Sequence, residues 1–319
     1  MKRPIELSIV IVNWKSREFL ENCLKSIHAN CNCLDYEIIV IDNASYDGSR
    51  EMLESQFADV VFIQSDENLG FARANNLAYN KSRGQNILFL NPDTEIQGRA
   101  LQTLMDTLQT IPDAGMVGAK LLNSDDTLQT TCITALPSIT NQALASNYLR
   151  SHFPSWSIWG MRPLYAGGQK VSQVEAISGA CMLAKREILD RIGCFTADYF
   201  MYAEDMDLCI KVNNTGAKIY YVPEAVIVHH GGGSSSSHSE SNFSSVMQRE
   251  SLAKFFELHR GRGYALMYRT STVLISAIRM AVIVLSSPIT ICKDGYRPFS
   301  RRANKWSSIL RWAVDMSKW

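Results

Sequence analysis

The stretch Leu7-Ser-Ile-Val-Ile-Val12 decides the fold class of this chain, and Asn13-Trp14 follow it directly. It is β-branched and almost continuously apolar, which is typical of a parallel strand buried on both faces. Similar apolar runs recur at Glu37–Ile41, Val60–Ile63 and Ile87–Leu90. Segments with helical apolar spacing lie at about 17–29, 48–56, 70–82 and 98–110. This alternation predicts crossover connections and an α/β fold with a mostly parallel central sheet flanked by helices.

The composition of the 319 residues is that of a globular protein. Apolar residues make up 46% and charged residues 20%, and 32 basic side chains face 31 acidic ones. These values exclude a disordered or fibrous chain, and the near-zero net charge leads us to expect no nucleic-acid partner. The eight cysteines are scattered without Cys-x-x-Cys pairs, which favours reduced thiols and a cytosolic compartment. The first apolar run is also too short for a signal-peptide core.

Polar, turn-forming residues follow each predicted strand of the first half. Asp42 and Asp93 are the carboxylates among them. Because ligands bind at the carboxyl ends of parallel strands, these positions mark the expected site. Either aspartate alone is explained as a helix cap or an Asx-turn, but the two together favour a ligand. A strand-end carboxylate such as Asp93 suits Mg²⁺ or Mn²⁺ carrying a diphosphate.

The second half adds two candidate groups. Glu204-Asp205 begins a helical pattern, where acids are favoured by the helix dipole but can also serve as a general base. Asp207 is expected to cap or solvate the first turn of that helix. His229 ends a late strand and is either structural or a metal ligand. The following glycines and serines, 231–237, predict a flexible loop that moves or lies against phosphate.

The remaining segments are less regular. Residues 112–170 are expected to be an insertion or loop region facing substrate, and Lys218–Val222 and Ala225–Val228 to be two separate late strands. No Gly-x-x-x-x-Gly-Lys-Ser/Thr, Gly-x-Gly-x-x-Gly or Gly-x-Ser-x-Gly motif occurs at the required places. Kinases, ordinary NTPases, NAD enzymes and α/β-hydrolases are therefore poor candidates.

The C-terminal tail changes character. Residues 264–292 are apolar, but the longest uncharged run, Met280–Cys292, is shorter than the roughly 20 residues that span a bilayer. Residues 293–319 carry seven basic side chains, with Trp306, Trp312 and Trp319 between them. Basic residues with interfacial tryptophans predict a segment on an anionic membrane surface. The alternative is a packed helical hairpin with a solvated basic face.

Seven sequence blocks occur in an order that resembles a known family. They are Ser8-Ile-Val-Ile-Val-Asn-Trp14, Ile41-Asp-Asn-Ala-Ser-Tyr-Asp-Gly-Ser49, Asn68-Leu-Gly-Phe-Ala-Arg-Ala-Asn-Asn76, Leu90-Asn-Pro-Asp-Thr94, Ser178-Gly-Ala-Cys-Met-Leu183, Phe200-Met-Tyr-Ala-Glu-Asp-Met-Asp-Leu-Cys209 and His229-His-Gly-Gly232. The chain resembles the family 2 inverting glycosyltransferases, specifically the bacterial rhamnosyltransferase-like branch, over about residues 7–233.

The resemblance implies a GT-A fold and a set of site residues. Val12 and Asn13 would border the base, Asp42 would contact the nucleoside, and Asn68 and Asn75 would lie along the donor pocket. Asp93 would hold a divalent metal, Mg²⁺ or Mn²⁺, with Asn91 in place of the family's first acid. Asp205 would be the catalytic base, with Glu204 as the rival candidate. His229 would lie near the diphosphate and metal, with His230 as the alternative.

We therefore expect three segments: a nucleotide-sugar-binding half (1–112), an acceptor and catalytic half (113–243) and a basic, membrane-associated helical tail (244–319). The expected activity is inverting transfer of a sugar from a dTDP- or UDP-sugar to a hydroxyl of a lipid-linked saccharide acceptor. L-rhamnose from dTDP-rhamnose is the leading donor. The enzyme would be peripheral on the cytoplasmic face of the inner membrane, in polysaccharide or O-antigen biosynthesis. The alternatives are a nucleotidyltransferase acting on sugar-1-phosphate and a catalytically inactive membrane-peripheral assembly module.

Overall fold

The computed structural model describes residues 5–31, 33–165, 170–231, 242–288 and 296–315. The chain forms two compact units. The sheet unit comprises 1–136, 151–200 and 204–237, and the helical unit comprises 137–150, 201–203 and 238–319. The predicted glycine- and serine-rich loop lies, beyond Gly231, outside the described residues. So do Cys292, Lys293 and Trp319 of the predicted tail.

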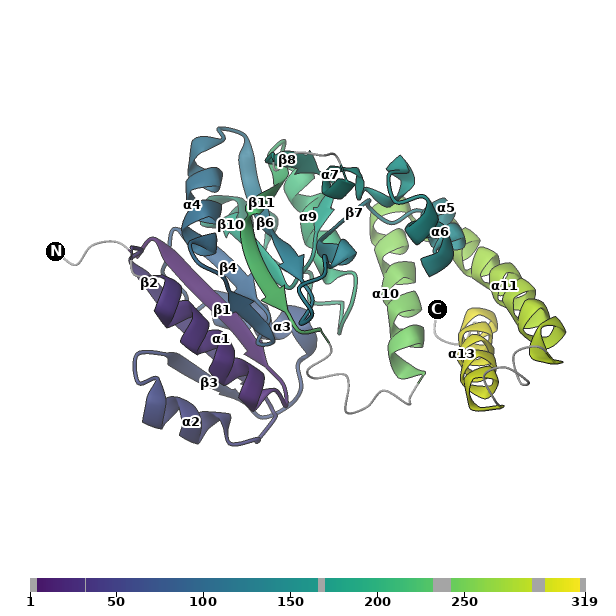
Figure 1. The fold of residues 1–319 in the computed structure, drawn as a ribbon, viewed down its shortest axis with the longest axis horizontal. Helices are drawn as coiled ribbons and strands as arrows, with labels where there is room; N and C mark the ends of the chain where they lie inside the picture. Colours follow the sequence, from purple (N-terminus) through teal and green to yellow (C-terminus); the bar gives the residue numbers. More distant parts are fainter. Residues whose placement is uncertain (1–4, 32, 166–169, 232–241, 289–295, 316–319) are drawn as a thin grey trace. The chain divides into compact units, whose positions relative to one another are not determined.

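The sheet unit is built on one mixed sheet (Figure 1). Its strands run in the order β3 (Val61–Ser65), β2 (Tyr36–Asn43), β1 (Leu7–Asn13), β4 (Asn86–Leu90), β10 (Cys181–Lys185), β6 (Ala114–Leu122), β11 (Lys218–His229) and β5 (Thr94–Ile96). A further strand, β8 (Ser172–Val174), pairs with β11. The pairs β1–β2, β2–β3, β1–β4 and β6–β11 are parallel, and β10 is antiparallel to both of its neighbours. The predicted mostly parallel mixed sheet is confirmed.

Helices cover this sheet where the apolar spacing predicts them. The sheet unit contains α1 (Arg17–Asn30), α2 (Ser49–Gln56), α3 (Gly70–Tyr79), α4 (Ala100–Thr110), α8 (Arg186–Ile192) and α9 (Glu204–Asn214). On α1, Leu20, Cys23, Leu24 and Ile27 form the buried stripe, because residues three and four apart share one face of a helix. Short elements fill the region after β6: η1 (Thr130–Cys132), β7 (Ile133–Thr134), η2 (Ser157–Trp159), α7 (Arg162–Tyr165) and β9 (Ala176–Ile177).

Two predictions for the second half are wrong. Residues 114–122 belong to β6, an inner strand with a buried centre, and are not part of a loop facing substrate. Gly115 and Gly118 interrupt the apolar run that would predict this strand from the sequence, since they stand where a buried strand usually has apolar side chains. A Cβ on Gly118 would lie 2.8 Å from Ile177 Cγ2, so close packing requires glycine there. The two predicted late strands are one strand, β11, with an irregularity between Val222 and Val226.

The strand register brings the candidate residues to one edge of the sheet. Asn13 pairs with Asp42 at the carboxyl ends of β1 and β2, and Ile11 pairs with Leu90 on β4. The antiparallel β10 begins at this same edge, because Cys181 pairs with Leu90. At the other side of the sheet β5 pairs with the end of β11, with His229 opposite Thr94.

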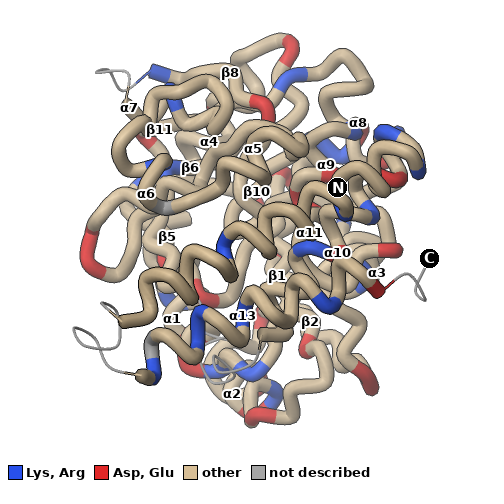
Figure 2. Tube along the Cα trace, turned by 90° about the vertical axis from the view of Figure 1, so that its right-hand side faces the viewer, with Lys and Arg blue, Asp and Glu red and all other residues tan. Residues whose placement is uncertain are grey.

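The helical unit packs α10 (Phe243–Arg260), α11 (Arg262–Leu285), α13 (Tyr296–Val314) and α5 (Ile139–Leu144) together, while α6 (Asn147–His152) runs from this unit into the sheet unit. Basic residues recur along α13, which carries no acidic residue (Figure 2). Trp312 is 8% exposed and lies under the Arg269 guanidinium, and Trp306 lies under Arg279. Trp312 therefore packs inside the unit, and its predicted interfacial role is wrong, whereas Trp306 is partly buried and an interfacial role for it stays a prediction.

The described part of the chain contains one helix long and apolar enough to cross a membrane by length and composition, α11. From its longest uncharged run alone, the apolar tail is predicted to be too short to span a bilayer. The helix α11 is longer than that run, because it includes Arg269 and Arg279 on its inward face. Arg269 is 4% exposed and donates to the carbonyl oxygens of Trp312, Ala313 and Asp315.

Candidate active site

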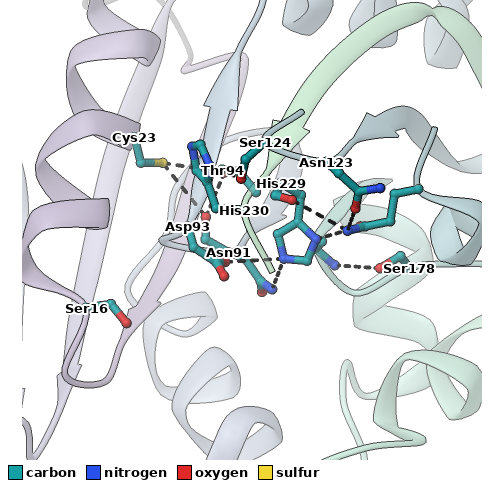
Figure 3. Close-up of polar contacts among 12 residues, drawn as sticks. Ser16, Cys23, Asn91, Asp93, Thr94, Asn123, Ser124, Ser178, His229 and His230 are labelled. Carbon is teal, nitrogen blue, oxygen red and sulfur yellow. Dashed lines mark hydrogen bonds and ion pairs between the residues drawn. The ribbon is translucent and has the colours of Figure 1, made fainter. Parts of the chain in front are cut away.

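The centre of the site is a pair formed by Asp93 and His229. Asp93 lies in the turn between β4 and β5, and His229 is the last residue of β11. Because β5 pairs with the end of β11, this turn is brought beside the histidine. His229 Nε2 lies 3.3 Å from Asp93 Oδ1, and both side chains are largely buried. Figure 3 shows the two side chains directed at each other, with Asn91 beside them.

Gln129 fixes the orientation of the His229 ring. The Gln129 amide nitrogen donates to Asn123 Oδ1 at 3.0 Å, so its oxygen is the atom that faces His229 Nδ1, at 2.7 Å. We therefore assign the proton to Nδ1, which leaves the Nε2 lone pair toward Asp93 and the Asn91 amide (3.3 Å). Gln129 lies in the segment predicted as a loop, and no motif in the sequence marks it.

This pair fits a divalent cation. Nε2 and Oδ1 both offer lone pairs, and two such atoms 3.3 Å apart repel each other unless a proton or a cation lies between them. Two ligands of one ion, each at about 2.1 Å and nearly at right angles, lie about 3.0 Å apart. Among the described residues no cluster of three or more His, Cys, Asp or Glu side chains could hold a metal. The protein could thus supply two strong ligands here, and a bound diphosphate would have to supply others.

His230 points to a different place. Its Nε2 lies 2.9 Å from Glu95 Oε1, its Nδ1 lies 2.8 Å from Ser124 Oγ, and its ring packs against Phe19. Only the His230 backbone N–H reaches Asp93, whose carbonyl oxygen accepts it at 2.9 Å. Of the two adjacent histidines, the structure places His229 beside the Asp93 carboxylate.

Asp42 and Asn13 form a buried network at the ends of β2 and β1. Asn13 Nδ2 donates to Asp42 Oδ1 at 2.8 Å, and Gln64 Nε2 and the Ser45 N–H donate to Asp42 Oδ2. Burial by itself would raise the pKa of Asp42, but the hydrogen bonds from Ser45, Gln64 and Asn13 outweigh it and hold the pKa below its ordinary value. Asp42 is therefore a charged group that orients the loop after β2. Val12, the residue before Asn13, is 8% exposed.

Asn68 organises the turn that enters α3. Its Oδ1 accepts from Asn43 Nδ2 and from the Gly70 N–H, each at 2.9 Å. Gly70 has φ +75°, and a Cβ there would lie 2.2 Å from the Phe200 carbonyl oxygen, so only glycine allows this approach. Asn75 is 1% exposed, and its Nδ2 donates to the Phe71 carbonyl within α3. Asn43 completes this turn and was not among the predicted site residues.

The acidic start of α9 contains three carboxylates with different surroundings. Asp205 Oδ1 accepts from the Met206 N–H at 2.8 Å and Oδ2 from the Gly179 N–H at 3.2 Å. Burial raises the pKa of Asp205 despite these hydrogen bonds. Gly179 is followed by Ala180, whose carbonyl oxygen accepts from the Asn91 N–H, so Asp205 lies at the sheet edge that carries the Asp93 turn. Glu204 is 6% exposed.

Asp207 has a structural role. It is 1% exposed, its Oδ2 accepts from Thr196 Oγ1 at 2.6 Å, and its Oδ1 accepts from the Tyr199 hydroxyl at 3.3 Å. The expectation that Asp207 caps or solvates the first turn is wrong, because its side chain turns inward to these hydroxyls and to Lys211.

Comparison with known proteins identifies the family. The profile described as "Glycosyl transferase family 2" matches residues 8–193, more than half of the chain. The low-salt glycan biosynthesis hexosyltransferase Agl10 of Haloferax volcanii is 25% identical over 67% of this chain, and the match spans 64% of that relative's length. The N-acetylglucosaminyl-diphospho-decaprenol L-rhamnosyltransferase of Mycobacterium tuberculosis is 23% identical over 70% of this chain and 75% of its own.

A solved structure shares the fold. The mannosyltransferase PcManGT of Pyrobaculum calidifontis, in complex with GDP-Man and Mn²⁺, aligns with a TM-score of 0.54 and 16% identity over 100% of this chain and 88% of its own. At this identity the likeness shows the GT-A fold alone. The profile match and the sheet with its strand-end carboxylates agree, and the chain belongs to glycosyl transferase family 2.

Proposed function

We propose that this glycosyltransferase transfers a sugar with inversion from a nucleotide donor to a hydroxyl of a lipid-linked saccharide. The single observation that carries the proposal is the gathering of Asp42, the Asp93–His229 pair and Asp205 at one sheet edge. L-rhamnose from dTDP-rhamnose is the proposed donor, which the rhamnosyltransferase relative supports. That relative's name also supports a lipid diphosphate acceptor.

In this proposal the first half of the sheet unit, 1–112, holds the nucleotide. Val12, Asn13 and Asp42 border the nucleoside, with Asp42 orienting Asn13 and the backbone at Ser45. Asn68 and Asn75 hold the α3 entrance beside the donor. Residues 113–243 supply the acceptor side and the base, and 244–319 form the membrane-associated segment.

Asp93 and His229 would hold the divalent ion, Mg²⁺ or Mn²⁺, and Asn91 would lie beside it. When bound, such an ion neutralises charge on a leaving diphosphate. The chain's own part is to keep the His229 Nε2 lone pair directed at Asp93, which the Gln129 hydrogen bond does. The solved structure that shares the fold contains GDP-Man and Mn²⁺, which supports the use of a divalent ion.

Asp205 is the proposed general base. Its carboxylate takes the proton of the acceptor hydroxyl while that oxygen bonds to the anomeric carbon and the bond to the diphosphate oxygen breaks. One carboxylate suffices, because the leaving group needs no proton when its charge is neutralised, unlike in glycoside hydrolysis. Since burial raises the pKa of Asp205, it binds a proton more readily than an exposed aspartate. Glu204, its buried neighbour, is the rival candidate.

We base the proposed membrane location on the apolar residues of α11 and not on the tryptophans of α13. Met267, Leu274, Ile278, Val282 and Leu285 are 57–80% exposed and follow each other at intervals of seven, four, four and three residues. They form one uncharged apolar stripe, which suits a helix lying in the interface of a membrane. We propose that the protein binds the cytoplasmic face of the inner membrane through this stripe.

The decisive experiment compares Asp205→Asn with Glu204→Gln in transfer from dTDP-rhamnose to a polyprenyl-diphosphate N-acetylglucosamine acceptor. Asp205→Asn should lower kcat by about 10²–10⁴-fold while leaving donor binding intact in a thermal-shift titration with Mn²⁺. Full turnover by Asp205→Asn together with loss in Glu204→Gln would assign the base to Glu204. A panel of sugar nucleotides in the same titration tests the donor, and pyrophosphate release from sugar-1-phosphate and an NTP would overturn the transferase assignment.

A further inference from the structure

The helical unit contains a cavity of its own. Its wall comes from the end of α5 (Gln142 and Ala145), from Arg249 on α10, from five residues of α11 between Tyr268 and Arg279, and from Trp306 on α13. The volume is about 40 Å³, roughly three times the space that one water molecule needs. The cavity therefore has room for a small polar group such as a phosphate.

The charges around this cavity have one sign. Arg249 and Arg279 line it, and its described lining residues include no carboxylate. Lys305 on α13 lies close enough that, after desolvation, the charges of Arg249 and Arg279 lower its pKa. Arg279 is held in place, because it donates to the Ala145 carbonyl at 2.9 Å and lies 4.6 Å from the centre of the Trp306 ring. Because no described lining residue is acidic, these neighbouring cations repel one another, and a bound anion would relieve that repulsion.

The wall also carries an unused hydrogen-bond donor. Tyr268 is 1% exposed, and its hydroxyl has no hydrogen-bond partner among the residues that the structure describes. The neighbouring hydroxyls of Ser271 and Thr272 donate to the Tyr268 carbonyl oxygen, at 2.7 and 2.9 Å, and neither oxygen meets hydrogen-bond geometry with the Tyr268 hydroxyl. A buried hydroxyl without a partner costs free energy, so its presence here indicates a ligand that accepts its proton. Two guanidinium groups and one hydroxyl donor together suit a phosphate oxygen.

We propose that this cavity binds a phosphate group carried on a lipid. The apolar stripe of α11 argues for a lipid over a free nucleotide, because the cavity residues and the stripe are parts of one helix, and a molecule with a charged head and an apolar tail would use both. The phosphate comes from one of two sources, the diphosphate of the lipid-linked acceptor or the headgroup of an anionic phospholipid. The first source rests on the proposed function, and the second does not.

The test uses variants of the full chain that should not unfold it. Arg249→Gln removes one of three mutually repelling cations, and Tyr268→Phe removes only the unpartnered hydroxyl, so the melting temperature should stay the same or rise in both. The matched controls are Arg301→Gln, which makes the same charge change at an exposed position of α13, and Tyr296→Phe, which removes a hydroxyl from a 66% exposed tyrosine.

Binding is measured by co-sedimentation with three vesicles: phosphatidylcholine alone, with phosphatidylglycerol, and with polyprenyl-diphosphate N-acetylglucosamine. Tyr268→Phe should weaken binding to the two vesicles of net negative charge about tenfold relative to Tyr296→Phe, which is the contribution expected of one hydrogen bond to a charged group. Arg249→Gln should weaken it more than Arg301→Gln. Loss confined to the polyprenyl-diphosphate vesicle assigns the cavity to the acceptor, and equal loss on both assigns it to phospholipid headgroups.

Two results overturn the inference. It fails if Arg249→Gln and Tyr268→Phe bind both charged vesicles as well as their controls do, or if either variant loses binding only together with a fall in melting temperature. Kinetics separate it from the proposed function, because loss of the cavity should raise the apparent KM for the lipid acceptor and not that for the sugar nucleotide. If the wild-type enzyme transfers no sugar while cavity-dependent binding persists, the proposed function fails and the phosphate site stands.

Discussion

Replacing Gln129 by Met tests the proposed metal-binding pair Asp93–His229 through a residue that would not itself bind the metal. The Gln129 oxygen accepts from His229 Nδ1 at 2.7 Å and thereby keeps the Nε2 lone pair toward Asp93. Methionine has similar length but offers no comparable acceptor. The backbone at this position should not move, because the Gln129 N–H donates to the Leu121 carbonyl of β6 at 2.9 Å. The change therefore acts on the histidine ring with little effect on the fold.

The expected loss in metal affinity follows from this one hydrogen bond. Outer groups that orient a metal-binding histidine contribute about 10–100-fold to affinity. That range equals about 1.4–2.8 kcal/mol. A hydrogen bond between neutral groups contributes about 0.5–1.5 kcal/mol, so we expect the lower end of the range, about tenfold. Gln129→Glu keeps an acceptor facing Nδ1 and makes the imidazole a stronger ligand, so it should bind metal at least ten times more tightly than Gln129→Met.

The assay follows free Mn²⁺ by electron paramagnetic resonance during titration of the enzyme with bound nucleoside diphosphate, so it does not depend on turnover. Thermal unfolding of each variant without metal provides the control for folding. Gln129 has no such orienting role if Gln129→Met binds Mn²⁺ within twofold of the wild type, or if Gln129→Glu loses as much affinity as Gln129→Met.

Three further outcomes are expected. The acid limb of the kcat/KM profile should report a pKa above that of an ordinary aspartate, about 3.9, because burial raises the pKa of Asp205 and only its charged form can act as base. An acid limb with a pKa at or below about 3.9 would contradict the assignment of Asp205 as the base. Asp42→Asn should destabilise the fold at pH 7 and progressively less as the pH falls. The pKa of Asp42 is lower in the folded state than in the unfolded state, so its charged form stabilises the fold at pH values above the unfolded pKa of about 3.9, and this stabilisation is lost on acidification. Urea unfolding at several pH values measures the effect, and a loss of stability that does not depend on pH would contradict it. Gly118→Ala should cost about 1–3 kcal/mol in urea unfolding, because its Cβ would lie 2.8 Å from Ile177 Cγ2; a neutral effect would show that β6 packs less closely.

Much of the first half could be predicted from the sequence. The apolar runs at β1, β2 and β4 are continuous and the helical stripes between them are regular, so local periodicity identifies both the elements and the sheet class. The polar residues after these strands could be assigned to one edge, because parallel strands end on the same side. Asp93 could be singled out for the same reason, whereas Asp205 at the start of α9 could be singled out only through the resemblance of the ordered blocks to a known family.

The second half could not be predicted as well, since its signals are not local. The glycines of β6 remove two apolar side chains, and only the closeness of Ile177 explains them. Gln129 is a single polar residue in an irregular segment, and it matters only because folding brings it to His229, 100 positions later.

The sequence by itself determined the α/β class, the strand-end carboxylates and the family blocks, because each depends on side-chain spacing along a few consecutive residues. Only the tertiary structure decided between His229 and His230, since pairing of β5 with β11 sets which ring faces Asp93. It also divided α11 into an outward apolar stripe and an inward face with two arginines. That division depends on which sides of the helix are covered by α10 and α13, and residues distant in the chain determine it.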